Sequence, residues 1–158
     1  MSKLLSTLML VLGVITLNGQ SFDQDKIALS NFIKRMYNNS PFEGVKIFED
    51  YTHVYLLSVV KLNKANYTST SAMNRVAQVK SRQQASIFMN GSDISSELII
   101  KSSKTNSGFT VTQISEIIRE QSIGFVDNME LLTNFDLENS DDLVFIFIRE
   151  MEATKKKK

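Results

Sequence analysis

The amino-acid sequence predicts an α+β fold, with a small mixed or antiparallel sheet and helices packed on one face. Stretches rich in β-branched and aromatic residues are interspersed with stretches whose apolar residues recur every three or four positions. Their order is helix, strand or hairpin, long helix, strand, helix, strand, strand, which favours α+β. The competing topology is a curved sheet that wraps around the long helix, as in cone-shaped ligand-binding folds.

Residues 1–19 have the features of a secretory signal peptide. Lys3 supplies the positive charge, and Leu4 to Leu17 form an apolar run that is shorter than the roughly 20 residues of a membrane span. We expect cleavage after Gly19, which leaves residues 20–153 as a single α+β domain and residues 154–158 as a basic, disordered tail. An uncleaved N-terminal anchor is the alternative. The mature protein is therefore expected in the periplasm or outside the cell.

The composition narrows the possible chemistry. The chain has no cysteine, so we expect neither disulfides, thiolate metal sites nor a lipoprotein anchor, and it has a single histidine, His53. Without Lys3 and the four terminal lysines, the basic residues are fewer than the 17 acidic ones, and the folded body is expected to be net negative. No basic stripe is present, which argues against nucleic-acid binding.

The first half of the mature chain predicts a helix followed by strands. Apolar residues between Ile27 and Tyr37 have helical spacing, and Pro41 ends that helix. Residues 45–62 are rich in β-branched and aromatic residues, and Glu49-Asp50 predicts a hairpin turn or a bulge between strands 45–48 and 52–62. Both faces of the second strand are largely apolar, which is typical of a strand inside a sheet.

The longest predicted helix covers residues 71–90, with a capping residue among 69–71 and Gly91 as its stop. A helical projection gathers six apolar residues on one side, namely Ala72, Met73, Val76, Ala77, Ile87 and Phe88. The alternating residues 94–102 then predict a second long strand.

The last third predicts a helix and a hairpin. Residues 111–121 have helical spacing, and Gly124 follows the expected end near Ser122. The inner side of the next strand is predicted to carry Phe125, Met129, Leu131 and Phe135. Residues 134–142 predict a turn, and the unbroken apolar run 143–148 predicts a central strand that pairs antiparallel with the one before it.

The segment from His53 to Ile148 resembles the LPP20-like domain of bacterial envelope proteins. Five features carry the resemblance, in this order: a strand that begins at Tyr55, a helix with small residues, a strand with Ser95-Ser96-Glu97, the polar helix 114–124 and a final hairpin. The small residues of that helix are Ala72, Ala77 and Ala85. The resemblance implies a non-enzymatic envelope or assembly protein, with no catalytic residue to transfer.

The long helix contains the candidate binding residues. Lys80, Gln83 and Gln84 project onto the same side as Val76, within the predicted buried stripe. Because a buried ammonium group needs a partner, Lys80 is expected either to be exposed on a helix end that overhangs the sheet, or to meet a carboxylate such as Glu97 in a polar seam. That seam would line a pocket or a partner groove.

These observations predict a non-catalytic interaction or assembly module of the cell envelope with an envelope protein as its partner. The alternatives are a small-molecule or lipid carrier, with a cavity between the long helix and the sheet, and a hydrolase that uses paired carboxylates. We expect no catalytic residue, metal site or cofactor. The oligomeric state is left open. Lys155, Lys156, Lys157 and Lys158 predict at most a weak contact with an anionic membrane surface.

Overall fold

The computed structural model describes residues 20–50, 53–91, 94–102, 109–121 and 128–151. The elements, in chain order, are α2 (Gln20–Asn39), β1 (Gly44–Asp50), β2 (His53–Asn63), η1 (Lys64–Asn66), α3 (Thr70–Gly91), η2 (Ser96–Leu98), β3 (Ile99–Lys101), α4 (Val111–Gln121), β4 (Glu130–Asp136) and β5 (Asp142–Met151). The α+β prediction is confirmed. The predicted signal peptide and basic tail lie outside the described residues and stay predictions.

The chain divides into two compact units, residues 1–41 and residues 42–158, and each is described by itself. The first contains α2, which begins at Gln20 rather than at Ile27 and ends at Asn39, close to the predicted stop. The backbone N–H of Ser40 donates to the carbonyl of Met36 at 3.0 Å, which satisfies a carbonyl in the last turn before Pro41.

The second unit contains a five-stranded mixed sheet with the strand order β3-β1-β2-β5-β4. Only the β1–β3 pair is parallel among these strands. β1 and β2 form an antiparallel hairpin in which Asp50 pairs with His53. The predicted hairpin is therefore confirmed, but Glu49 and Asp50 belong to β1 and not to the turn.

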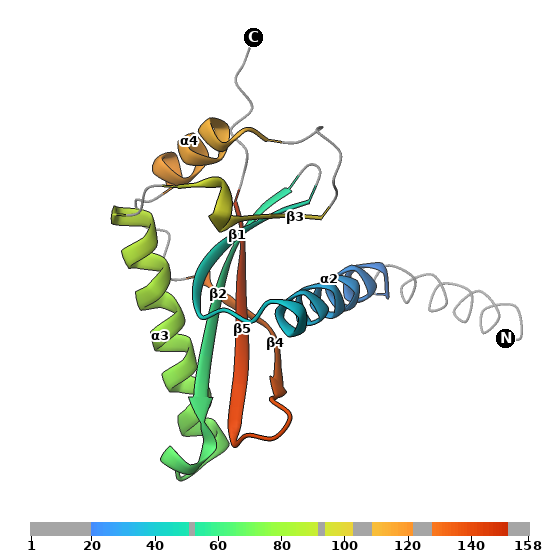
Figure 1. Cartoon of the computed structure of the whole chain (residues 1–158), viewed down its shortest axis with the longest axis vertical. Helices are drawn as coiled ribbons and strands as arrows, with labels where there is room; N and C mark the ends of the chain where they lie inside the picture. Colours follow the sequence, from blue (N-terminus) through green and yellow to red (C-terminus); the bar gives the residue numbers. More distant parts are fainter. Residues whose placement is uncertain (1–19, 51–52, 92–93, 103–108, 122–127, 152–158) are drawn as a thin grey trace, which may run out of the picture. The chain divides into compact units, whose positions relative to one another are not determined.

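The two strands predicted to be internal are indeed internal. β2 lies between β1 and β5, and β5 lies between β2 and β4 (Figure 1). The β2–β5 pairing is the longest in the sheet and runs from Val54 opposite Met151 to Asn63 opposite Asp142. The predicted hairpin of β4 and β5 is confirmed as well.

Two details of the predicted strands are wrong. The alternating residues 94–102 form only the three-residue strand β3, because the N–H of Leu98 bonds to the carbonyl of Ser95 and closes the 3₁₀ turn η2. Leu131 and Phe135 do not share one face of the sheet, since a register shift separates Leu131 from Thr133. Leu131 lies opposite Phe147 of the core cluster but is 46% exposed, whereas Phe135 is buried and lies opposite Val144, on the other face. Phe125 lies outside the described residues.

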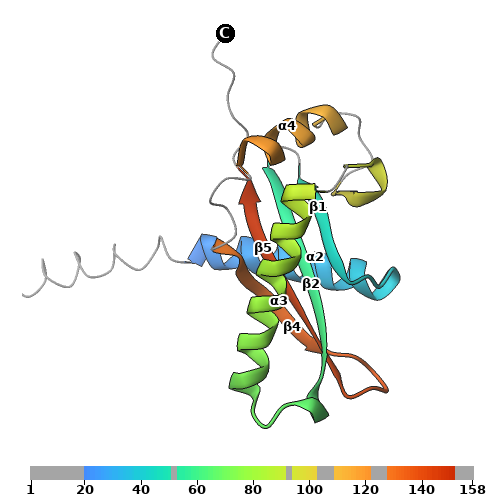
Figure 2. The same ribbon diagram turned by 90° about the vertical axis from the view of Figure 1, so that its left-hand side faces the viewer.

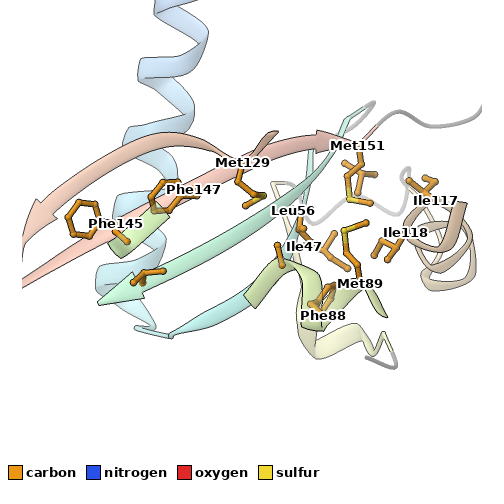
Figure 3. Packing of buried hydrophobic residues seen from close by; sticks show 14 of the residues in the cluster. Ile47, Leu56, Phe88, Met89, Ile117, Ile118, Met129, Phe145, Phe147 and Met151 are labelled. Atoms are coloured by element: carbon orange, nitrogen blue, oxygen red, sulfur yellow. The ribbon is translucent and has the colours of Figure 1, made fainter. Parts of the chain in front are cut away.

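Helices α3 and α4 pack against one face of the sheet, with α3 running along it and α4 near one of its ends (Figure 2). The side chain of Ser69 caps α3 by accepting the N–H of Ala72 at 3.2 Å. The apolar core between these layers includes Met89 of α3, Ile117 and Ile118 of α4 and Met151 of β5 (Figure 3).

The buried side of α3 differs from the predicted stripe. It follows residues four apart, Met73, Ala77, Ser81, Ala85 and Met89, together with Phe88, whereas Ile87 is 65% exposed. Each step of four residues moves about 40° around a helix. Sheets are twisted, so a long helix that stays in contact with a sheet buries an oblique row of its residues. A projection of the helix onto a single face does not reveal such a row.

Candidate functional site

Three polar residues, Ser58, Ser81 and Gln84, meet between α3 and the sheet. Ser58 of β2 and Ser81 of α3 are both fully buried. The hydroxyl of Ser58 donates to Oε1 of Gln84 at 2.8 Å and lies 3.4 Å from the carbonyl oxygen of Ser81. A strand side chain as short as serine thus reaches the helix backbone. The small side chains along the buried row of α3 allow this approach.

The structure separates the four predicted site residues. Gln84 is half-buried and faces β2, while Lys80, Gln83 and Glu97 are exposed. Lys80 and Glu97 form no ion pair with each other in the described part of the chain, so the predicted Lys80–Glu97 contact is absent there. Nor does the helix end overhang the sheet, because Ala85, Phe88 and Met89 beyond Lys80 are buried.

Lys80 and Gln83 belong instead to a surface that combines charge with apolar area. Val79 and Ile87 are each 65% exposed on α3. Val79, Gln83 and Ile87 are four residues apart and therefore neighbours on one side of the helix, with Lys80 beside them. We call these four residues the outer face of α3.

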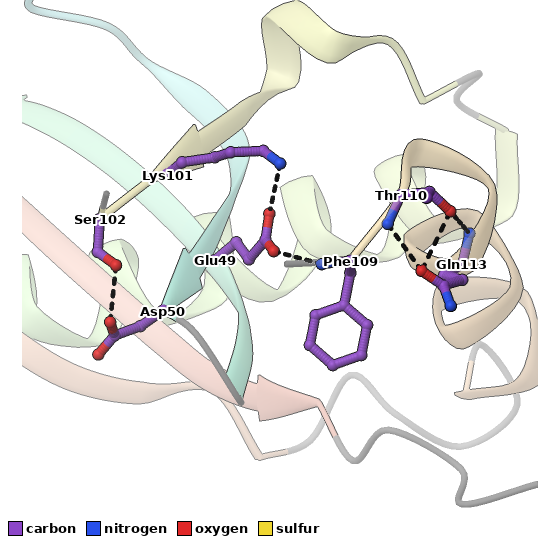
Figure 4. Close-up of polar contacts among 7 residues, drawn as sticks. All are labelled: Glu49, Asp50, Lys101, Ser102, Phe109, Thr110 and Gln113. Atoms are coloured by element: carbon purple, nitrogen blue, oxygen red, sulfur yellow. Dashed lines mark hydrogen bonds and ion pairs between the residues drawn. The ribbon is translucent and has the colours of Figure 1, made fainter. Parts of the chain in front are cut away.

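A second polar cluster lies at the edge of the sheet (Figure 4). The Glu49 side chain is only 3% exposed; its Oε1 accepts the backbone N–H of Phe109 at 2.5 Å, and its Oε2 lies 3.2 Å from Nζ of Lys101. Next to it, the carbonyl of Glu49 accepts the N–H of Ser102, and Oδ1 of Asp50 accepts the Ser102 hydroxyl at 2.7 Å. Glu49 therefore joins β1, β3 and Phe109, the residue before the Thr110 cap of α4.

The sequence interpretation missed the Glu49 cluster because Glu49-Asp50 suggests a hairpin turn or a bulge. A signal was present: two carboxylates directly after an apolar strand segment, and a lysine near the end of the predicted strand 94–102. The start of α4 also has a sequence signature, since Thr110 and Gln113 form a reciprocal capping box. The N–H of Gln113 donates to Oγ1 of Thr110 at 3.2 Å, and the N–H of Thr110 donates to Oε1 of Gln113 at 2.8 Å.

Two other titratable groups among the described residues are His53 and Arg149. His53 lies 3.6 Å from Glu150, and both side chains are about half exposed. Loss of hydration lowers the pKa of Arg149 on β5, although an arginine stays protonated in proteins. No group of three or more histidine, aspartate or glutamate residues in the described ranges could hold a metal ion.

Comparison of the chain with protein-family models, with curated proteins and with solved structures finds no match. None of the helices that the structure describes combines the length and the apolar character needed to cross a bilayer.

Proposed function

We propose that this protein is an exported, non-catalytic interaction module of the cell envelope, and that the outer face of α3 binds its protein partner. The proposed binding surface rests on Val79 and Ile87, two large apolar side chains that are 65% exposed on the same side of one helix. Isolated exposed apolar residues are ordinary, but two aligned with a glutamine between them form a contact strip of the kind that interfaces bury.

The charge of α3 indicates what kind of partner fits. The helix contains Arg75, Lys80 and Arg82 and no aspartate or glutamate. Arg75 and Lys80 are exposed. A partner surface that pairs apolar side chains with carboxylates would match this pattern, because complementary charge speeds encounter and rejects wrong partners.

The competing function, a small-molecule or lipid carrier, needs a cavity between α3 and the sheet. The hydroxyl of Ser58 lies within 3.4 Å of the backbone of Ser81 there, and Ala77 and Ala85 on either side of it are fully buried. This close packing supports partner binding over ligand storage at this interface. The resemblance of the element order to the LPP20-like domain supports a place in the envelope.

A binding measurement with two matched double variants tests the proposal. Val79→Glu with Ile87→Glu puts two charges on the outer face of α3, and Asn74→Glu with Gln78→Glu puts the same two charges on other exposed positions of the same helix. The tagged chain and both variants are incubated with envelope extract of the native host, and each protein retained by the unmodified chain is quantified.

We expect the first variant to lose at least tenfold in retained partner, as is typical when a central contact is destroyed, and the second to retain it. Circular dichroism of both variants shows whether the fold is intact. Equal retention by the two variants would rule out the outer face of α3 as the binding surface.

A further inference from the structure

Helix α4 contacts the rest of the molecule through a narrow set of side chains. Ile114, Ile117 and Ile118 are buried in the apolar core, and all other described α4 side chains are partly or fully exposed. Figure 3 shows Ile117 and Ile118 directed toward Met89 of α3 and Met151 of β5. An isolated helix of 11 residues is marginal in water, so α4 depends on this contact and on whatever holds its first turn in place.

Glu49 holds that first turn. Its Oε1 accepts the N–H of Phe109, the residue before the capping Thr110, while Oε2 pairs with Lys101. Oε2 has no other polar partner among the described residues. A hydrogen bond from a backbone N–H to an ionised carboxylate is stronger than a neutral one, and low exposure strengthens it further.

We propose that Glu49 is a latch: its carboxylate keeps α4 docked, and loss of its charge lets α4 detach while the sheet and α3 stay folded. The pairing of β1 with β2 and of β2 with β5 involves no α4 residue, so these strands remain paired when the helix opens. Opening uncovers the part of the core beside Met89 and Met151. α4 is thus a detachable element of the fold.

Thiol labelling tests the latch, because the natural chain has no cysteine to interfere. One reporter is Ile118→Cys on α4, and the reference reporter is Val60→Cys in β2; both positions are 2% exposed. Each is made in the full chain, alone and combined with Glu49→Gln, Lys101→Met or Glu97→Gln. Glu97 is an exposed glutamate beside β3 and serves as the matched charge control.

We expect Glu49→Gln to raise the labelling rate at position 118 about tenfold, with position 60 unchanged, because an amide oxygen accepts the Phe109 N–H in a weaker, neutral hydrogen bond and the ion pair with Lys101 is lost. Lys101→Met should raise it less, because the charged acceptor of the Phe109 N–H remains. Unchanged labelling at 118, equal acceleration at both reporters, or an equal effect of Glu97→Gln would each overturn the proposal.

Amide hydrogen exchange of the cysteine-free chain is the second measurement, in case either reporter variant fails to fold. The latch predicts faster exchange confined to α4 in Glu49→Gln. Exchange that rises in β2 and β5 to the same extent, or that does not rise in α4, contradicts it.

Discussion

The two serines that face each other between α3 and β2 have opposite roles. The Ser58 hydroxyl has a good acceptor in Gln84 at 2.8 Å. Oγ of Ser81 is fully buried and has no hydrogen-bond partner among the described residues. A buried donor with a partner stabilises the fold, and one without a partner is a net cost.

Substituting each serine by alanine should therefore change stability in opposite directions. Ser58→Ala is expected to lower the free energy of unfolding by about 1 kcal/mol, because a hydrogen bond is lost. Ser81→Ala is expected to raise it by up to about 1 kcal/mol, because an unpaired buried hydroxyl disappears and alanine favours helix. Urea unfolding of both variants measures this, and a change of the same sign in the two contradicts it.

At single residues, the sequence predicted the two faces of β2 correctly and the surroundings of Glu49 wrongly. The alternation of β2 placed its side chains correctly on two faces, because the period of a strand is fixed by the backbone. Glu49 was expected in a turn or a bulge, because carboxylates are common in turns. Its burial is tolerable because the parallel neighbour β3 brings Lys101 alongside its carboxylate.

At the scale of elements, α3 depends on small side chains in the middle of its buried row. Ala85→Leu is expected to lower the free energy of unfolding by about 2 kcal/mol, because there is no space for three more carbon atoms against the sheet. Gln78→Leu adds a leucine on the exposed side and should change stability by less than about 0.5 kcal/mol. Urea unfolding compares them, and equal effects would contradict the close packing of α3.

The first turn of α4 depends on its capping box. Thr110→Ala removes the oxygen that accepts the N–H of Gln113 and should destabilise the helix by about 1 kcal/mol. The effect should be local, so we expect faster amide exchange in α4 with unchanged exchange in β2. Acceleration of both elements to the same degree would show that α4 unfolds only with the whole domain.

Element types were predictable where the pattern was long, and the bounds of α3 and α4 agree with their predicted bounds to within one residue. The short elements were not predictable, because η2 interrupts a stretch that alternates like a strand. The bulge in β4 could not be predicted from the sequence either, because it depends on how β4 pairs with β5.

At the scale of the whole molecule, the α+β class followed from the order of elements, but the strand order did not. β3 pairs parallel with β1 after the chain has passed through β2 and α3, a connection that no local pattern specifies. The proposed binding face, the outer face of α3, could not be predicted either. The projection placed Ile87 in the core, and only the oblique contact of α3 leaves it exposed beside Gln83.

Export is a prediction about the whole chain. Cleavage after Gly19 predicts that the native protein begins at Gln20, because the apolar run ends just before that point. Intact-mass analysis of the protein from the host's envelope and cytosolic fractions tests this. A native protein that retains Met1 and fractionates with the cytosol would exclude the exported module.

Site-specific photo-crosslinking tests the binding surface most directly. A photoreactive amino acid replaces Gln83 on the outer face of α3 or, as a matched control, Gln78 on another exposed side of the same helix. We predict that irradiation in the native host joins position 83 to one envelope protein, that Val79→Glu with Ile87→Glu abolishes this product, and that position 78 gives none. A product of equal yield from both positions, or none from position 83, would contradict the assignment of this face to a partner.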